Sequence, residues 1–290
     1  MSKFSRPTRR AAYVFGLLAA AVGCQVEQLD PAYVHVPAVD VETEPQQGAA
    51  VSGITDVRVV LGSESLGFYP LPATIPVLPG ASRRLLVEPV VKVSGQSSSR
   101  TVYPLLEALA VEPTLRANTV DTLRPTLRYV EEAEFLLVDD GAGVRTRLAE
   151  DLDGDAGSSL RVSPDPFGSA RTVIAGELTA TNPVIEVASE ALLPDRQPQA
   201  MWLELDYRGE VPITVGLISG QIGTPASRVP RYAQGALARE DWTRIYFQLG
   251  GPFDEDLLGG PLRVALLAVR SEDAAGPQRF AVDNLRLVYR

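Results

Sequence analysis

Short runs of alternating apolar and polar residues, separated by glycine and proline clusters, constrain the fold of this chain most. Successive side chains of a β-strand point to opposite faces, so a period of two indicates a strand with one buried face. The runs are clearest in the last third of the chain, at residues 201–207, 211–217, 242–249, 262–269 and 280–289. Many short strands with turn residues between them, and no convincing helix, predict an all-β protein.

Two β regions are expected, since a chain of 290 residues suits two domains. Residues 54–130 contain short runs such as 57–61 and 84–93, and prolines between and within these runs exclude long helices there. We predict a small antiparallel β-sandwich over 54–130. A larger jelly-roll β-sandwich is predicted over 131–290.

The N-terminus has the pattern of an export signal. Four basic residues precede an apolar stretch at 11–22, which is shorter than the roughly 20 residues needed to cross a bilayer. The stretch ends Ala21-Val22-Gly23-Cys24, which resembles a bacterial lipobox, although that motif usually has Leu where Ala21 stands. The resemblance implies that residues 1–23 are a lipoprotein signal peptide and that Cys24, the only cysteine, carries the lipid. The alternative is an ordinary secretory signal with an incidental cysteine.

A lipidated Cys24 implies a cell-envelope protein held on a membrane through its N-terminal fatty acyl chains. Gln25 replaces the Asp that usually marks retention in the inner membrane, so the resemblance implies the outer membrane. The proline-containing segment 24–53 is expected to be a semi-extended tether. Valines at 34, 36 and 39 leave open that part of it docks as a strand.

The charge of the chain argues against some partners. The net charge is −9, and removing the four basic residues of the leader makes it −13. A body this acidic repels nucleic-acid phosphates and anionic lipids. We therefore expect no nucleic-acid partner, and anchoring by the lipid alone.

Residues 54–130 resemble a PEGA-type domain. The resemblance rests on Val57-Arg58-Val59, on Leu66-Gly67, and on the segment 71–80 with the strand that follows it. It implies a small surface β module without activity of its own. The half at 101–130 departs from the pattern, because a single such domain does not need it.

The end of the chain resembles the last three strands of galactose-binding-like and carbohydrate-binding jelly rolls. The matching runs are 242–249, 262–266 and 280–288, the last with Asp283-Asn284 between apolar residues. This resemblance implies the fold and a glycan ligand. Sandwiches of this kind also bind proteins or act as spacers.

Six side chains form the predicted ligand face. On two strands, aromatic rings share one face with hydrogen-bonding groups, the combination that sugar recognition uses. They are Trp202, Glu204 and Asp206 on one strand and Trp242, Arg244 and Tyr246 on the other. The alternative is that both Trp rings pack against a core.

An acidic run at 150–155 has the composition of a calcium loop. It is not an EF-hand, because Ala156 and Val162 stand where that loop needs Gly and Glu. The jelly-roll resemblance implies one structural calcium, with Glu150, Asp153 and Asp283 as ligands. The alternative is an acidic turn. No other cofactor is expected.

Catalysis finds little support in the sequence. His35 is the only histidine and lies in the expected tether, which excludes a Ser-His-Asp arrangement in the folded part. We predict a non-catalytic lipoprotein whose jelly roll binds glycan. The alternatives are an accessory structural subunit of an outer-membrane or secretion complex, with an envelope protein as partner, and a glycan-active enzyme.

Overall fold

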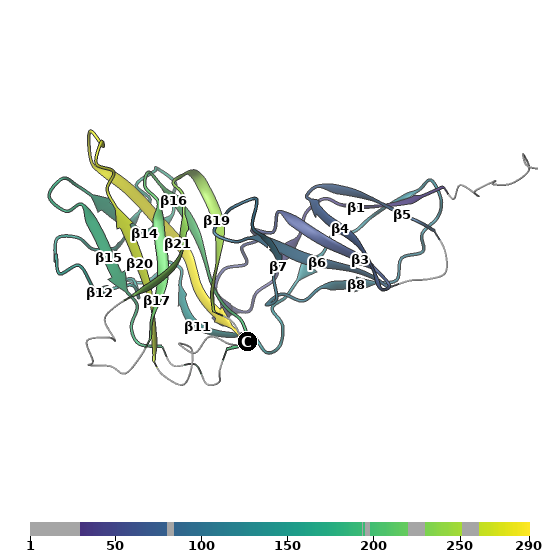
Figure 1. The fold of residues 1–290 in the computed structure, drawn as a ribbon, viewed down its shortest axis with the longest axis horizontal. Coiled ribbons are helices and arrows are strands. Elements are labelled where there is room, and N and C mark those ends of the chain that lie inside the picture. The colour runs from purple at the N-terminus through teal and green to yellow at the C-terminus, as the bar shows by residue number, and fades with distance from the viewer. Residues whose placement is uncertain (1–29, 80–83, 193, 195–197, 220–229, 251–260) are drawn as a thin grey trace, which may run out of the picture.

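The computed structural model describes residues 30–79, 84–192, 194, 198–219, 230–250 and 261–290. In these residues the regular structure consists of β-strands and one short 3-10 turn, η2 (Pro45–Gln47). The all-β prediction is confirmed. The strands form two β-sandwiches placed end to end along the long axis of the molecule (Figure 1).

The N-terminal sandwich contains β1 to β10. One sheet has the order β4-β3-β6-β7, with β8 also paired to β6. A second sheet has the order β5-β1-β9, and β2 and β10 form a separate pair. The strands are β1 (Ala32–Val36), β2 (Asp40–Val41), β3 (Asp56–Leu61), β4 (Glu64–Pro70), β5 (Ala73–Val77), β6 (Leu85–Lys92), β7 (Arg100–Val102), β8 (Leu109–Val111), β9 (Val120–Thr122) and β10 (Thr126–Leu127).

The described part of the predicted tether belongs to this sandwich. β1 pairs with β5 and β9, and Ala32, Val34 and Val36 are fully buried. Burial of every second side chain along β1 explains why a segment with linker-like composition folds. The prediction of a tether is therefore corrected for residues 30–53. A second departure is that β1–β9 and β2–β10 are parallel, in a sandwich that was expected to be antiparallel.

The C-terminal sandwich contains β11 to β21 in two antiparallel sheets. One has the order β13-β14-β21-β16-β19, with β11 also paired to β21, and the other has the order β12-β15-β20-β17-β18. From β14 to β17 the chain alternates between the sheets, and it does so again from β18 to β21, as in a jelly roll. The strands are β11 (Glu134–Asp139), β12 (Glu150–Asp151), β13 (Arg161–Pro164), β14 (Thr172–Leu178), β15 (Val184–Ala188), β16 (Met201–Gly209), β17 (Ile213–Ser219), β18 (Arg231–Ala236), β19 (Arg239–Gly250), β20 (Leu262–Val269) and β21 (Gln278–Tyr289).

The core of the C-terminal sandwich comes from the faces that the alternation predicts. Met201, Leu203 and Leu205 on β16 pack with Ile245 and Phe247 on β19. The strand β20, which coincides with the apolar run at 262–269, lies between β15 and β17. The opposite face of the β16–β19 sheet is turned toward the N-terminal sandwich. This face carries most of the residues that were predicted to bind a ligand.

Candidate functional site

The predicted ligand face lies mainly against the N-terminal sandwich. Trp202, Glu204 and Asp206 share one face of β16, and β19 places Tyr246 opposite Glu204 and Arg244 opposite Asp206. The two strands are thus neighbours, as the predicted patch requires. However, Trp202 is 1% exposed and Glu204 is 0% exposed. Because the other domain covers these groups, they form an interdomain contact, which corrects their assignment to an open ligand face.

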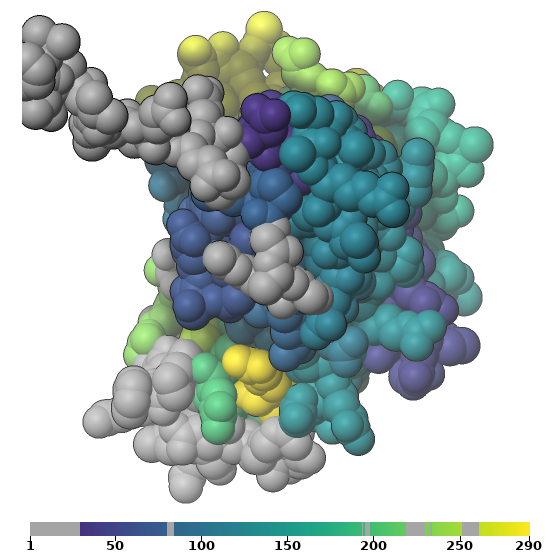
Figure 2. Space-filling model, turned by 90° about the vertical axis from the view of Figure 1, so that its right-hand side faces the viewer, coloured from purple at the N-terminus to yellow at the C-terminus, as the bar shows by residue number. Residues whose placement is uncertain are grey.

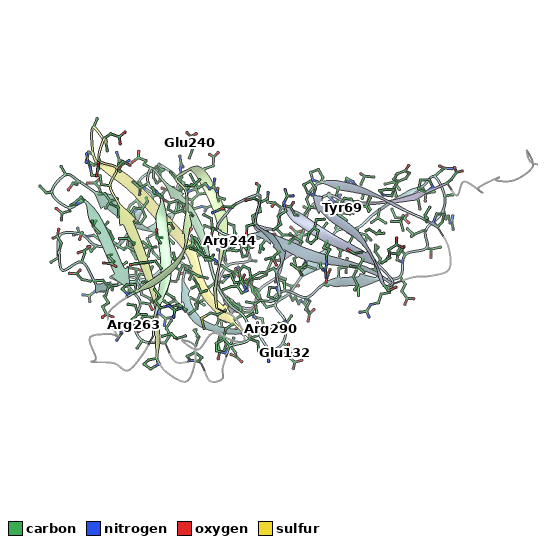
Figure 3. All side chains as sticks on the ribbon, viewed as in Figure 1. Tyr69, Glu132, Glu240, Arg244, Arg263 and Arg290 are labelled. Carbon is green, nitrogen blue, oxygen red and sulfur yellow. The ribbon has the colours of Figure 1, made fainter. Side chains whose placement is uncertain are left out.

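Glu204 is the centre of this contact. Its Oε2 accepts hydrogen bonds from Arg244 Nη2 at 2.7 Å and Arg286 Nε at 2.8 Å. Both carboxylate oxygens accept from the hydroxyl of Tyr129 at 2.9 Å, and Oε1 also accepts from the hydroxyl of Tyr103. We call these five residues the Glu204 cluster. Since the two tyrosines belong to the N-terminal sandwich, the cluster ties the two sandwiches together, and Figure 3 shows Arg244 where they meet.

The electrostatics of the cluster favour an ionised carboxylate. Burial alone would raise the pKa of Glu204, but the guanidinium groups of Arg286 and Arg244 and the hydrogen bond from Tyr103 lower the pKa to about 2. Burial and the charge of Glu204 raise the pKa of Tyr103 and of Tyr129 well above the usual value. Both hydroxyls therefore remain donors to the carboxylate.

A bulge in β21 positions Arg244. The register of β21 against β16 shifts near Asn284, which has a φ of 48°, a conformation that Asn tolerates better than most residues. The Asn284 carbonyl accepts a hydrogen bond from Arg244 Nη1 at 2.8 Å, and its amide donates to Asp206 Oδ2 at 2.7 Å. Asp206 Oδ1 also pairs with Arg244 Nη1 at 3.2 Å. Asp206 and Arg244 are thus paired with each other and with Asn284 inside the protein.

Aromatic packing and backbone bonds extend the contact. The ring of Tyr103 meets Trp202 edge-on at 5.1 Å and lies 5.2 Å from Tyr246, between centroids. The backbone N–H of Ser94 donates to the Tyr246 carbonyl at 2.8 Å. Trp202 and Tyr246 join the hydrophobic core of the N-terminal sandwich. The core of the N-terminal sandwich therefore extends onto the outer face of the β16–β19 sheet, while the core of the C-terminal sandwich lies on the other face of that sheet.

Sequence reasoning placed Arg244 beside Glu204 but missed the other three partners of Glu204, which are Arg286, Tyr103 and Tyr129. The signal for Arg286 was a charged residue between Leu285 and Leu287 in an apolar closing strand. Gly53 was missed too: a Cβ there would lie 2.4 Å from Cβ of Arg244, so only glycine allows this approach. Nothing in the local sequence marked the two tyrosines.

Trp242 lies apart from the Glu204 cluster and is partly buried. Its indole Nε1 donates to Asp165 Oδ2 at 3.1 Å, and the guanidinium of Arg171 lies 5.5 Å from the ring centroid. In the same β13–β14 loop, Phe167 packs under the guanidinium of Arg208 at 4.7 Å. Residues of this loop thus contact the Trp242 ring and its indole Nε1, the groups that were predicted to contact a sugar.

The three predicted calcium ligands do not converge. Glu150 pairs with Arg263 at 3.1 Å, and Asp153 accepts a hydrogen bond from the backbone N–H of Glu186 at 2.9 Å. Asp283 lies on β21, in the other sheet. Among the described residues, no three His, Cys, Asp or Glu side chains are grouped to hold a metal ion. The structure gives no support to the calcium site, because these three carboxylates are divided between the two sheets and two of them bind other partners there.

An open pocket of about 460 Å³ lies along β13 and β14. The strand pairing places Arg161 opposite Ala175 and Glu177 opposite Arg279, so charged side chains surround a small one. We call it the β13–β14 pocket. It is lined by Gly157, Ser159, Arg161, Ser163, Pro166, Ala175, Gly176, Glu177, Thr179, Thr181, Asn182 and Arg279.

Cys24 and the signal peptide lie outside the described residues, so lipidation remains a prediction from the sequence. In the part of the chain that is described, no helix is long and apolar enough to span a bilayer.

Comparison with known proteins gives structural likeness only. No protein-family model and no curated protein match the sequence. The PEGA-type resemblance therefore remains a prediction. The chain is similar to the K3 adhesin domain of Lys-gingipain from Porphyromonas gingivalis W83, with 13% identity and a TM-score of 0.36 over 54% of this chain and 98% of that one. It is similar to a family 29 carbohydrate-binding module from Piromyces equi, with 12% identity and a TM-score of 0.32 over 55% and 92% of the two chains. A third similar structure, from the carbohydrate-binding modules of the β-sandwich superfamily, has 13% identity and a TM-score of 0.35 over 89% and 98%.

Proposed function

We propose that this protein is a non-catalytic glycan-binding module, displayed at the outer membrane on a lipid attached to Cys24. The observation that carries the proposal is the β13–β14 pocket of the C-terminal sandwich. Its guanidinium, amide and hydroxyl groups provide both donors and acceptors on one open surface. Sugars need many such partners, because each of their hydroxyls loses water on binding.

The pocket chemistry favours binding over hydrolysis. Glycosidases generally use two carboxyl groups, about 5 to 9.5 Å apart. Glu177 is the one carboxylate among the residues that line the β13–β14 pocket. We therefore propose that a bound glycan is held without being cleaved.

The position of the chain start supports display away from the membrane. The described chain begins at Asp30, just before β1, and β1 lies at the end of the molecule opposite β14 and β15 (Figure 1). Figure 2 looks onto this end, where β1 and the residues near β9 lie together, as their pairing requires. The chain from Cys24 to Asp30 spans at most about 20 Å. A lipid at Cys24 would hold the N-terminal sandwich near the bilayer and present the pocket at the far end.

Glycan binding is tested with the full-length protein solubilised in detergent and applied to an array of neutral and acidic glycans. We expect retention on at least one class without release of new reducing ends. Retention on none of them would overturn the proposal. Release of new reducing ends would instead support the alternative of a glycan-active enzyme.

Anchoring is tested separately by Cys24→Ser. We expect the variant to lose the lipid mass and to leave the membrane fraction, or to stall with its leader uncleaved. A variant that keeps the mature mass and still partitions into detergent would contradict lipidation at Cys24.

A further inference from the structure

The β13–β14 pocket carries a positive charge on an acidic protein. Two arginines and one glutamate line it, in a chain whose net charge is −9. At physiological salt, charges more than about 8 Å away are largely screened. A ligand in the pocket therefore responds mainly to these three groups and to the carboxylate of Asp155, which lies at the pocket edge and accepts a hydrogen bond from the backbone N–H of Gly157 at 2.9 Å.

The two arginines are available to a ligand. Arg161 makes one side-chain hydrogen bond among the described residues, from Nε to Ser159 Oγ at 3.4 Å, and no ion pair there. Arg279 Nε lies 4.0 Å from Glu177, and both of these side chains are about half exposed. In contrast, Arg244 and Arg286 are buried against Glu204 at 2.7 and 2.8 Å. The pocket therefore leaves guanidinium donors directed at solvent.

The strand register brings these donors to one hollow. Arg161 stands opposite Ala175, and Arg279 stands opposite Glu177, two residues further along the same strand. Arg161 and Arg279 lie on the two strands that flank β14, about 10 Å apart across the sheet and offset by two residues, a separation that two long side chains can span. The small Ala175 leaves room between them for a planar group.

We propose that the β13–β14 pocket recognises a carboxylated sugar of the uronic-acid class, with Arg161 and Arg279 binding its carboxylate. The proposal rests on the proposed glycan-binding function and names its ligand class. Guanidinium matches the planar carboxylate with parallel hydrogen bonds, which a neutral sugar cannot accept in that form. Asn182 and Ser163 remain to bind hydroxyl groups, while the charge of Glu177 opposes the ligand.

The test measures binding of oligogalacturonate and oligomannuronate, each beside its methyl ester, to the detergent-solubilised full-length protein. Esterification removes the charge and keeps the sugar ring. We expect at least one free acid to bind roughly tenfold or more tightly than its ester, the loss expected for a charge-assisted hydrogen bond. Added salt should weaken the binding of the acid and leave the ester unaffected.

Three variants locate the effect. Arg161→Gln should weaken binding of the acid roughly tenfold, while Arg116→Gln, an exposed arginine of the N-terminal sandwich, should leave it unchanged. Glu177→Gln should strengthen it severalfold, because it removes the opposing charge at nearly constant shape. Unchanged melting temperatures would show that all three variants are folded.

The outcomes separate this inference from the proposed function. Binding to glycans of the array without preference for either acid over its ester, or an Arg161→Gln variant that binds the acid normally, overturns the uronate proposal and leaves glycan binding standing. Weaker acid binding by Glu177→Gln overturns the charge argument. Failure to bind any glycan overturns both proposals.

Discussion

Glu204→Gln tests whether the Glu204 cluster holds the two sandwiches together. The amide keeps the size of the side chain but removes the charge that faces Arg244 and Arg286. Loss of one partner from a buried ion pair typically costs about 3–5 kcal/mol. Asp206 still faces Arg244 at 3.2 Å, so we expect the lower end of that range, about 3 kcal/mol.

The pH dependence of unfolding gives a second value for the free energy that ionised Glu204 contributes to folding. The pKa of Glu204 is about 2 in the folded protein, against 4.5 for an unperturbed Glu. Because the folded pKa is the lower one, the carboxylate contributes its full stabilisation above about pH 4.5 and loses it as the pH falls toward 2. At 1.36 kcal/mol per pKa unit the contribution is about 3 kcal/mol, in agreement with the first argument.

Urea unfolding followed by tryptophan fluorescence measures both effects, since Trp202 lies in the same contact. We expect Glu204→Gln to unfold at lower urea than the wild type at pH 7, and the difference to shrink by pH 3. Glu240→Gln, which changes an exposed carboxylate, serves as the control. Equal midpoints for the wild type and Glu204→Gln at pH 7, or a difference independent of pH, would refute the reasoning.

Three further perturbations follow from particular contacts. Trp202→Ala should lower the free energy of unfolding by about 3–5 kcal/mol, since the ring is fully buried. Trp242→Ala should lower it less, because that ring is only partly buried. Equal losses of stability in thermal unfolding would contradict this difference in burial. Gly157→Ala would place a Cβ 2.3 Å from Asn182 Nδ2, and we expect weaker glycan binding at a nearly unchanged melting temperature; unchanged binding would remove Asn182 from the site. Melting curves with and without EDTA should coincide, because the carboxylates predicted to bind calcium do not converge, and a drop of several degrees on chelation would restore a metal site.

The sequence predicted what depends on local periodicity. The run 262–269 coincides with β20, and the apolar face of 201–207 is the one that packs inward. β1 was predicted only as an alternative to a tether, because the prolines near it are typical of a linker, although every second residue of that strand is buried.

The candidate site was harder to predict, because long-range pairing decides it. Alternation placed Trp202 and Glu204 on one face, but periodicity does not show whether that face meets solvent or another domain. The partner Tyr103 is 101 residues from Glu204 in the chain. The β13–β14 pocket likewise joins Arg161 to Arg279 through two sheet registers, which a local pattern does not reveal.

The packed contact between the sandwiches also has a consequence for ligands that are polymers. Because side chains pack across this contact, the two sandwiches keep one relative orientation, so the β13–β14 pocket keeps its position relative to the N-terminal sandwich. If the protein is anchored through Cys24 and binds glycan as proposed, neighbouring copies would present many pockets on one membrane surface. A polysaccharide bound by one copy would then be held at high effective concentration for its neighbours, so weak single sites would add up to firm attachment.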